Sequence, residues 1–219
     1  MCLCMPVCCY RFGELAVLDE FNIVLVGVGG QGTILAAEIL GAAAVKDGLN
    51  VRVSEIHGMA QRGGTVTSNV RIGRKVLSST VLEGQADVLV GFEPLETIRN
   101  LKFASETTLV IMSDERISPT ELAAKKIEYP SFHEIVEKIY LFTKKLTIVQ
   151  TEKLAKEAGS SLTRNVILLG ALAAAERFPI KTESLREALK ELVPAKHVEV
   201  NLKAFTLGYE YVMQKAKPF

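Results

Sequence analysis

The sequence predicts a single α/β domain with a mostly parallel sheet, an inserted β-hairpin and a helical C-terminal third. Strand-like apolar runs alternate with helical patterns over the first two thirds of the chain, which is typical of strands joined by helical crossovers. The last third carries helical patterns only. The 219 residues, 48% of them hydrophobic, suffice for one buried core without disulfide or metal support.

The first elements predict a Rossmann-like unit of strand, glycine turn, helix and strand. Phe21 to Gly27 is apolar and rich in branched residues, as expected for a strand buried on both faces. Residues 31–47 form a helix that is apolar almost all round, and Gly48 follows it as a stop signal. The next strand is Asn50 to Glu55, which we expect to be reached by a right-handed parallel crossover.

A hairpin is predicted next, because Thr65 to Ile72 alternates between two faces and Gly73 offers a turn before Lys75 to Ser78. The other expected strands are 86–92, 107–112, 127–129 and 146–149. The other expected helices are 94–103, 132–139, 151–158, 162–178, 182–193 and 197–213. With no internal repeat or linker, residues 21–219 should form one domain.

The N-terminal extension, residues 1–20, is expected to be disordered. It holds all four cysteines, Cys2, Cys4, Cys8 and Cys9, in a spacing that matches neither zinc-binding pairs nor a ferredoxin cluster run. It also lacks the basic start and long apolar stretch of a signal peptide. We therefore expect reduced cysteines and a cytoplasmic protein.

Charge and hydropathy exclude two kinds of partner. The formal net charge is +1 and no run gathers five like charges, so a nucleic-acid partner is not expected. The longest uncharged run, 21–37, has glycines at its centre, so no membrane span is expected either.

The mean hydropathy of +0.23 is high for a protein whose whole surface is in contact with water. Either the core is unusually large, or a partner subunit covers an apolar patch.

The glycine turn is the first candidate ligand site. Gly27, Gly29, Gly30, Gln31 and Gly32 belong to the run GVGGQG, which follows a strand and opens a helix, as the dinucleotide fingerprint requires. Such a helix N-terminus can bind an anion. Glu55 lies roughly where an acidic ribose contact would be expected. A free-standing NAD-dependent dehydrogenase therefore remains an alternative, although the same glycines also serve tight packing.

The loop after the second strand, IHGMAQRGG, is the other candidate. It holds His57, Gln61, Arg62, Gly63 and Gly64 at the carboxyl end of a strand, where ligands of open α/β sheets collect. A guanidinium binds carboxylate or phosphate in a two-pronged manner, and the glycines can bring backbone N–H groups beside it. The alternatives are a structural ion pair for Arg62 and a structural hydrogen bond for His57.

No serine elbow, paired carboxylates, His/Cys metal cluster or P-loop lysine occurs in the domain. We therefore predict no catalytic residue and no metal site on this chain. Three readings remain open at this point. They are a subunit whose reactive groups lie elsewhere, the dehydrogenase, and a nucleotide-binding interaction module.

Four separated motifs narrow the choice. They are GVGGQG, HGMAQRGG, SNVRIG and ADVLVGFEPLE, and in this order they resemble the gamma-type subunits and domains of the 2-oxoacid:ferredoxin oxidoreductases. The wording of the second loop is closest to the indolepyruvate branch of that family. The resemblance spans 21–212 and includes Asn165, Gly170, Asn201, Phe205 and Gly208.

The resemblance implies a complex that oxidatively decarboxylates arylpyruvates. With coenzyme A and oxidised ferredoxin it would give aryl-acetyl-CoA, CO2 and reduced ferredoxin. Thiamine diphosphate, Mg and iron–sulfur clusters would belong to a larger alpha subunit, in an alpha2beta2 assembly, and this chain alone would bind no cofactor. The glycine turn would then line a coenzyme A or active-site cleft, Glu55 would have no ribose role, and part of the apolar surplus would form a subunit interface.

Overall fold

The computed structural model describes residues 20–58, 63–117 and 128–215. Six strands form one sheet in the order β2-β3-β1-β4-β5-β6. They are β1 (Phe21–Val28), β2 (Val51–His57), β3 (Thr65–Ile72), β4 (Val88–Gly91), β5 (Leu109–Ser113) and β6 (Leu146–Val149). The neighbours β1/β4, β4/β5 and β5/β6 run parallel, while β3 is antiparallel to both β1 and β2.

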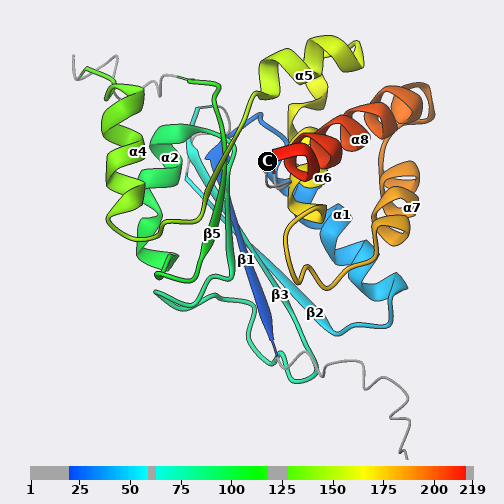
Figure 1. Cartoon of the computed structure of the whole chain (residues 1–219). Helices are drawn as coiled ribbons and strands as arrows, with labels where there is room; N and C mark the ends of the chain where they lie inside the picture. Colours follow the sequence, from blue (N-terminus) through cyan, green and yellow to red (C-terminus); the bar gives the residue numbers. More distant parts are fainter. Residues whose placement is uncertain (1–19, 59–62, 118–127, 216–219) are drawn as a thin grey trace, which may run out of the picture.

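The α-helices of the described residues lie on both faces of this sheet (Figure 1). They are α1 (Thr33–Lys46), α2 (Pro94–Arg99), α4 (Phe132–Tyr140), α5 (Thr151–Ala158), α6 (Arg164–Ala173), α7 (Thr182–Leu192) and α8 (Val198–Lys215). Short 3-10 turns occur at Leu101–Phe103, Ser161–Thr163 and Ala195–His197. The expected α/β fold, with a mostly parallel sheet, an inserted hairpin and a helical final third, is confirmed.

The alternation of β1 divides the core into two apolar clusters. Ile23 and Leu25 face α1 and the C-terminal helices, whereas Val24 and Val26 face the side that carries α2 and α4. Figure 1 shows α2 and α4 on one face of the sheet and α1, α6, α7 and α8 on the other. Strands buried on both faces need such near-continuous apolar sequence.

The hairpin uses a different pair of strands from the predicted one. β2 pairs with β3, from Val51 opposite Ile72 to His57 opposite Val66, so the connecting loop is 58–64. The predicted return strand, Lys75 to Ser78, is irregular. The core of β3 is buried on both faces and therefore needs full-length neighbours. In addition, Arg71 donates to the backbone oxygens of Ser78 (3.1 Å) and Thr80, which holds this segment away from the ladder.

Two other predicted elements differ from the structure. Glu128 and Tyr129, from the expected strand 127–129, are irregular, and Ile127 lies outside the described residues. The helix expected over 162–178 covers Arg164–Ala173 only. The chain turns after Ala173, Arg177 takes a left-handed φ of 63°, and Phe178 packs edge-on against Phe21 with ring centres 6.1 Å apart. The apolar residues after Ala173 thus belong to a turn that packs against β1 through Phe178.

Candidate functional site

The turn between β1 and α1 brings backbone to the carboxyl edge of the sheet. Gly30 (φ 102°) and Gly32 (φ 76°) take left-handed conformations, which a side chain would strain. Gly32 is the N-cap of α1 and has no side-chain capping bond. The N-terminus of α1 therefore offers N–H groups and a partial positive charge, and the anion site expected there stays a prediction.

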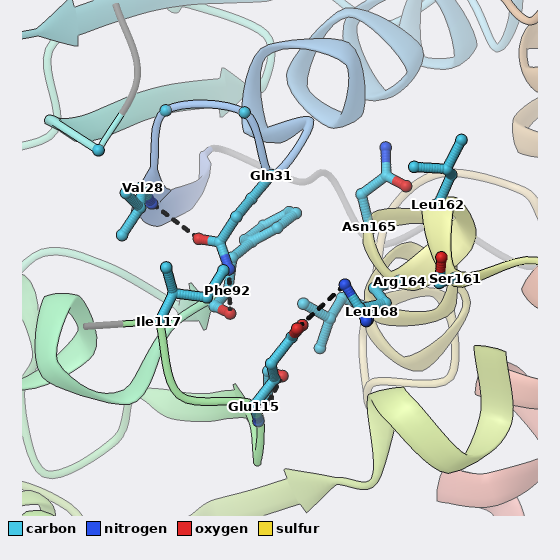
Figure 2. Close-up of a pocket in the computed structure, with 14 residues that line it drawn as sticks. Val28, Gln31, Phe92, Glu115, Ile117, Ser161, Leu162, Arg164, Asn165 and Leu168 are labelled. Carbon is cyan, nitrogen blue, oxygen red and sulfur yellow. Dashed lines mark hydrogen bonds and ion pairs between the residues drawn. The ribbon is translucent and has the colours of Figure 1, made fainter. Parts of the chain in front are cut away.

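Gln31 braces this turn instead of pointing its amide at a ligand. Its Oε1 accepts a hydrogen bond from the Val28 N–H at 2.7 Å, and its Nε2 donates to the backbone oxygen of Phe92 at 3.0 Å (Figure 2). The absence of a side chain at Gly27 makes room for this brace, because a Cβ there would lie 2.8 Å from Gln31 Oε1 and from Phe92 Cβ. The turn is thereby fixed to the end of β4.

The second glycine loop packs directly on the first. The Gly29 N–H donates to the Gly64 oxygen at 2.8 Å, and the Gly63 N–H donates to the Gly29 oxygen at 3.5 Å. The structure thus brings together the two motifs that the sequence nominates separately. Gln61 and Arg62 lie outside the described residues.

His57, at the end of β2, is exposed and lies at a wider, separate cleft. Its Nδ1 atom is 3.4 Å from the Gly58 oxygen. The cleft has a volume of about 590 Å³ and is lined also by Gly30, Gly32, Ile34 and Glu38. His57 and the glycine turn therefore line the same cleft.

A narrower cleft of about 260 Å³ also borders the glycine turn (Figure 2). Gly29, Gly30, Gln31 and Gly63 form one wall. The opposite walls contain residues that we did not nominate from the sequence: Phe92, Ser113, Glu115, Ile117, Ser161, Leu162, Arg164, Asn165 and Leu168. Ser113 ends β5 and Phe92 follows β4, so the position of both at the carboxyl ends of parallel strands was a usable signal. Arg164 and Asn165 open α6, and only the tertiary fold brings them here.

An ion pair lies across this narrow cleft. The Nη1 atom of Arg164 is 3.0 Å from Glu115 Oε1. Burial raises the pKa of Glu115 above its ordinary value, although the nearby Arg164 charge lowers it. Asn165 is 6% exposed, and its Nδ2 donates to the Gly32 oxygen at 3.5 Å. Among the described residues, neither Arg164 Nε nor Asn165 Oδ1 has a hydrogen-bond partner.

Glu93 holds the rear of the site. Its buried carboxylate caps α2 by accepting from the Glu96 N–H at 2.8 Å. It also accepts from the Tyr129 hydroxyl and from the Ile117 N–H at 3.4 Å. Burial raises the pKa of Glu93, while the bond from Tyr129 lowers it. This carboxylate therefore joins α2 to the segment after β5 that carries Glu115.

The sheet order bears on the nicotinamide alternative. In the structure Glu55 lies opposite Ser68 on β3, and Ser68 lies opposite Leu25 on β1. Two strand spacings, about 10 Å, therefore separate β2 from the strand that leads into the glycine turn. In the dinucleotide unit the acidic residue follows the strand beside the first one. The inserted β3 displaces Glu55 from that place.

The described residues contain no group of three His, Cys, Asp or Glu side chains that could hold a metal ion. The predicted cysteine tail lies in residues 1–19 and hence outside them. In the same described part of the chain, no helix is both long and apolar enough to cross a membrane.

The fold and the glycine-lined clefts fit a subunit of a 2-oxoacid oxidoreductase, and residues 22–211 match the family model for pyruvate ferredoxin/flavodoxin oxidoreductases. The chain belongs to this family. It is 44% identical over 192 residues to the indolepyruvate oxidoreductase subunit IorB of Pyrococcus horikoshii. That match covers 87% of this chain and 95% of the relative. These comparisons give no support to the NAD-dependent dehydrogenase.

Solved structures carry the same fold. The gamma subunit of a keto/oxoacid ferredoxin oxidoreductase from Geobacter sulfurreducens superimposes with a TM-score of 0.63 at 25% identity, covering 89% of this chain and 99% of that one. A 2-oxoglutarate:ferredoxin oxidoreductase from Magnetococcus marinus gives 0.65 at 23% identity, with 92% of this chain matching 32% of the larger one. The fold thus also occurs as one part of a longer polypeptide.

Proposed function

We propose that this chain is a required subunit, without catalytic residues of its own, of an indolepyruvate (arylpyruvate) ferredoxin oxidoreductase. The complex oxidatively decarboxylates an aryl 2-oxoacid and transfers the acyl group to coenzyme A. The products are aryl-acetyl-CoA, CO2 and reduced ferredoxin. The observation that carries the proposal is the 44% identity to an indolepyruvate oxidoreductase subunit over nearly all of that relative's length.

The paired glycine loops are the part of this chain that we assign to the shared active-site cleft or coenzyme A channel. The loops form a backbone-lined surface at the carboxyl edge of the sheet, with Gly29 bonded to Gly63 and Gly64. His57 supplies a polar contact to an anionic group, and so do Gln61 and Arg62, which directly precede Gly63 in the sequence. Gln31 acts as a structural brace in this assignment, because both ends of its amide bond to backbone.

We assign the cofactors to a larger alpha subunit, in an alpha2beta2 complex that passes electrons to ferredoxin in the cytoplasm. Thiamine diphosphate needs a magnesium site and iron–sulfur clusters need several cysteines. The described residues of this chain offer no three-ligand metal group, so they do not fit these cofactors. No chemical step is placed on the described residues.

The test of the cleft assignment is Arg62→Ala in the reconstituted complex. Loss of a charge-assisted contact should raise KM for coenzyme A or for the 2-oxoacid about tenfold or more. The matched control is Arg52→Ala, because Arg52 is exposed on the outer strand β2. Unchanged Michaelis constants would remove Arg62 from the site.

The nicotinamide alternative has a separate test. The full chain should leave NADH fluorescence unchanged during titration, because Glu55 lies two strands from β1. A saturable enhancement would favour the dehydrogenase.

A further inference from the structure

We propose that Arg164 and Asn165 form a binding site for an oxyanion, phosphate or carboxylate, that carries a neighbouring hydrogen-bond donor, and that Glu115 occupies this site when no ligand is bound. This inference rests on the proposed function, because it names a ligand contact in the cleft beside the glycine loops.

The guanidinium of Arg164 uses only part of its hydrogen-bonding capacity within the described residues. It makes an ion pair with one oxygen of Glu115, and its Nε–H is buried without a partner among the described residues. A guanidinium binds an oxyanion best through two parallel N–H···O bonds. A buried N–H that makes no bond costs about 1–3 kcal/mol. A ligand with two oxygens would satisfy Nε and an Nη together, which Glu115 does not do.

Asn165 supplies an acceptor on the wall of the same cleft. Its side chain is 6% exposed and lines the narrow cleft, yet its Oδ1 has no partner in the described part of the chain. The same amide contacts the Gly32 oxygen through Nδ2, which fixes its place against the glycine turn. Because Oδ1 only accepts, it favours an N–H or O–H in the part of the ligand that faces Asn165.

The size of the cleft limits what enters it. A volume of about 260 Å³ is smaller than the roughly 300–1,000 Å³ of a pocket for a whole small molecule. It therefore suits one anionic group with its neighbouring atoms, while the rest of the ligand extends past exposed Leu162.

Glu115 is suited to give way to such a ligand. It follows β5 on a short irregular segment, where its N–H donates to Ser113 Oγ at 3.0 Å. Its side chain is 19% exposed and lines the cleft, and among the described residues its one ion-pair contact is with Arg164. An arriving oxyanion exchanges one carboxylate–guanidinium contact for two, and Glu115 turns towards solvent.

Calorimetric titration of the full chain tests this proposal, with inorganic pyrophosphate and phenylpyruvate as probes in separate arms. Arg164→Gln should weaken binding of the preferred probe about tenfold or more. Glu115→Gln should strengthen it several-fold, because the internal competitor loses its charge. Arg52→Gln, which makes the same charge change on an exposed strand, should leave binding unaltered.

The double variant Glu115→Gln/Arg164→Gln guards against misfolding, because it removes both partners of the ion pair together and leaves no single charge unpaired. Folded by circular dichroism, it should bind neither probe. Tighter binding of pyrophosphate identifies phosphate as the ligand group, and tighter binding of phenylpyruvate identifies carboxylate. Failure of wild type to bind either probe, or binding that Arg164→Gln leaves intact, overturns the proposal. A complex that still assembles and turns over in that case leaves the proposed function standing.

Discussion

Gln31 lies inside the glycine fingerprint, and its amide bonds to the backbone on both sides of the turn, at Val28 and Phe92. The glycine positions could be predicted from the sequence, because a strand running into glycines and then into a helix has one local solution. The brace could not, because its second partner is 61 residues away. The same applies to Arg164 and Glu115, which become neighbours only when α6 packs beside the end of β5.

The brace predicts a stability effect. Gln31→Ala would leave the N–H of Val28, a residue 3% exposed, without its acceptor. A buried donor without a partner costs about 1–3 kcal/mol, so urea unfolding should show a loss of about 2 kcal/mol. Gln150→Ala is the control, because Gln150 is exposed and caps no helix N–H with its side chain. Equal stability of both variants would contradict the brace.

Glu93 predicts a pH dependence. Burial raises its folded-state pKa above the ordinary value of 4.5. The stability that this group contributes is therefore fully present below pH 4.5, and it is lost as the pH rises through the raised pKa. Glu93→Gln cannot titrate, so wild type should lose stability relative to this variant as the pH rises from about 4.5.

The measurement is the free energy of unfolding of both proteins across this pH range. The offset is the difference between the two free energies of unfolding. An offset that is constant with pH reports only the hydrogen bonds to Tyr129, Glu96 and Ile117 that the substitution alters. The change of the offset with pH isolates the titration of Glu93. An offset that stays flat, or that moves in favour of wild type, would show that burial does not raise this pKa.

At the scale of elements, β3 is the feature that separates this domain from a nucleotide-binding unit. Its alternation predicts a strand, but not a position between β1 and β2. That position follows from burial, because a strand covered on both faces needs two full-length neighbours. One consequence is that Gly63 and Gly64, just before β3, reach the glycine turn, where both bond to Gly29. The insertion thus builds the site and displaces Glu55.

Helices α6 and α8 pack backbone against backbone at two glycines, Gly170 and Gly208. A Cβ at Gly170 would lie 2.1 Å from the Phe205 oxygen, and one at Gly208 would lie 2.0 Å from the Ile167 oxygen. Both obstacles are backbone, so the helices themselves would have to move apart. Gly170→Ala and Gly208→Ala should each lower the free energy of unfolding by about 3 kcal/mol or more.

The control for this prediction is Gly41→Ala, another glycine within a helix. A Cβ there meets only the Val53 Cγ2 methyl, at 3.2 Å. The gain in helix propensity is about 1 kcal/mol, so stability should change by no more than that. A small effect at Gly170 or Gly208, measured in the same urea series, would mean that α6 and α8 do not approach so closely.

At the scale of the molecule, exposed apolar side chains lie around the clefts. Leu162 is 81% exposed at the narrow cleft, and Ile34 is 38% exposed at the wide one. Others, such as Leu77 and Leu141, lie elsewhere. The high mean hydropathy predicted either a large core or a covered surface, and the structure shows both a double-sided core and apolar side chains left exposed.

We predict that the alpha subunit covers Leu162. Leu162→Glu should leave thermal unfolding unchanged, because the side chain is exposed, and should weaken association with the partner about tenfold or more. Leu77→Glu, at a site that is 91% exposed, is the control and should associate normally. Calorimetric measurement of the affinity of both variants for the partner subunit tests this prediction. Normal association of Leu162→Glu would place the interface on another surface.

The central claim is that this chain works as one subunit of a larger oxidoreductase. The most direct measurement is oxygen-free purification of the chain from the cells that make it, followed by analysis of bound protein, thiamine and iron. The account predicts co-purification with a larger chain that carries thiamine diphosphate and iron, and reduction of ferredoxin with indolepyruvate and coenzyme A. Isolation of this chain alone, with neither cofactor nor activity in any fraction that contains it, would contradict the account.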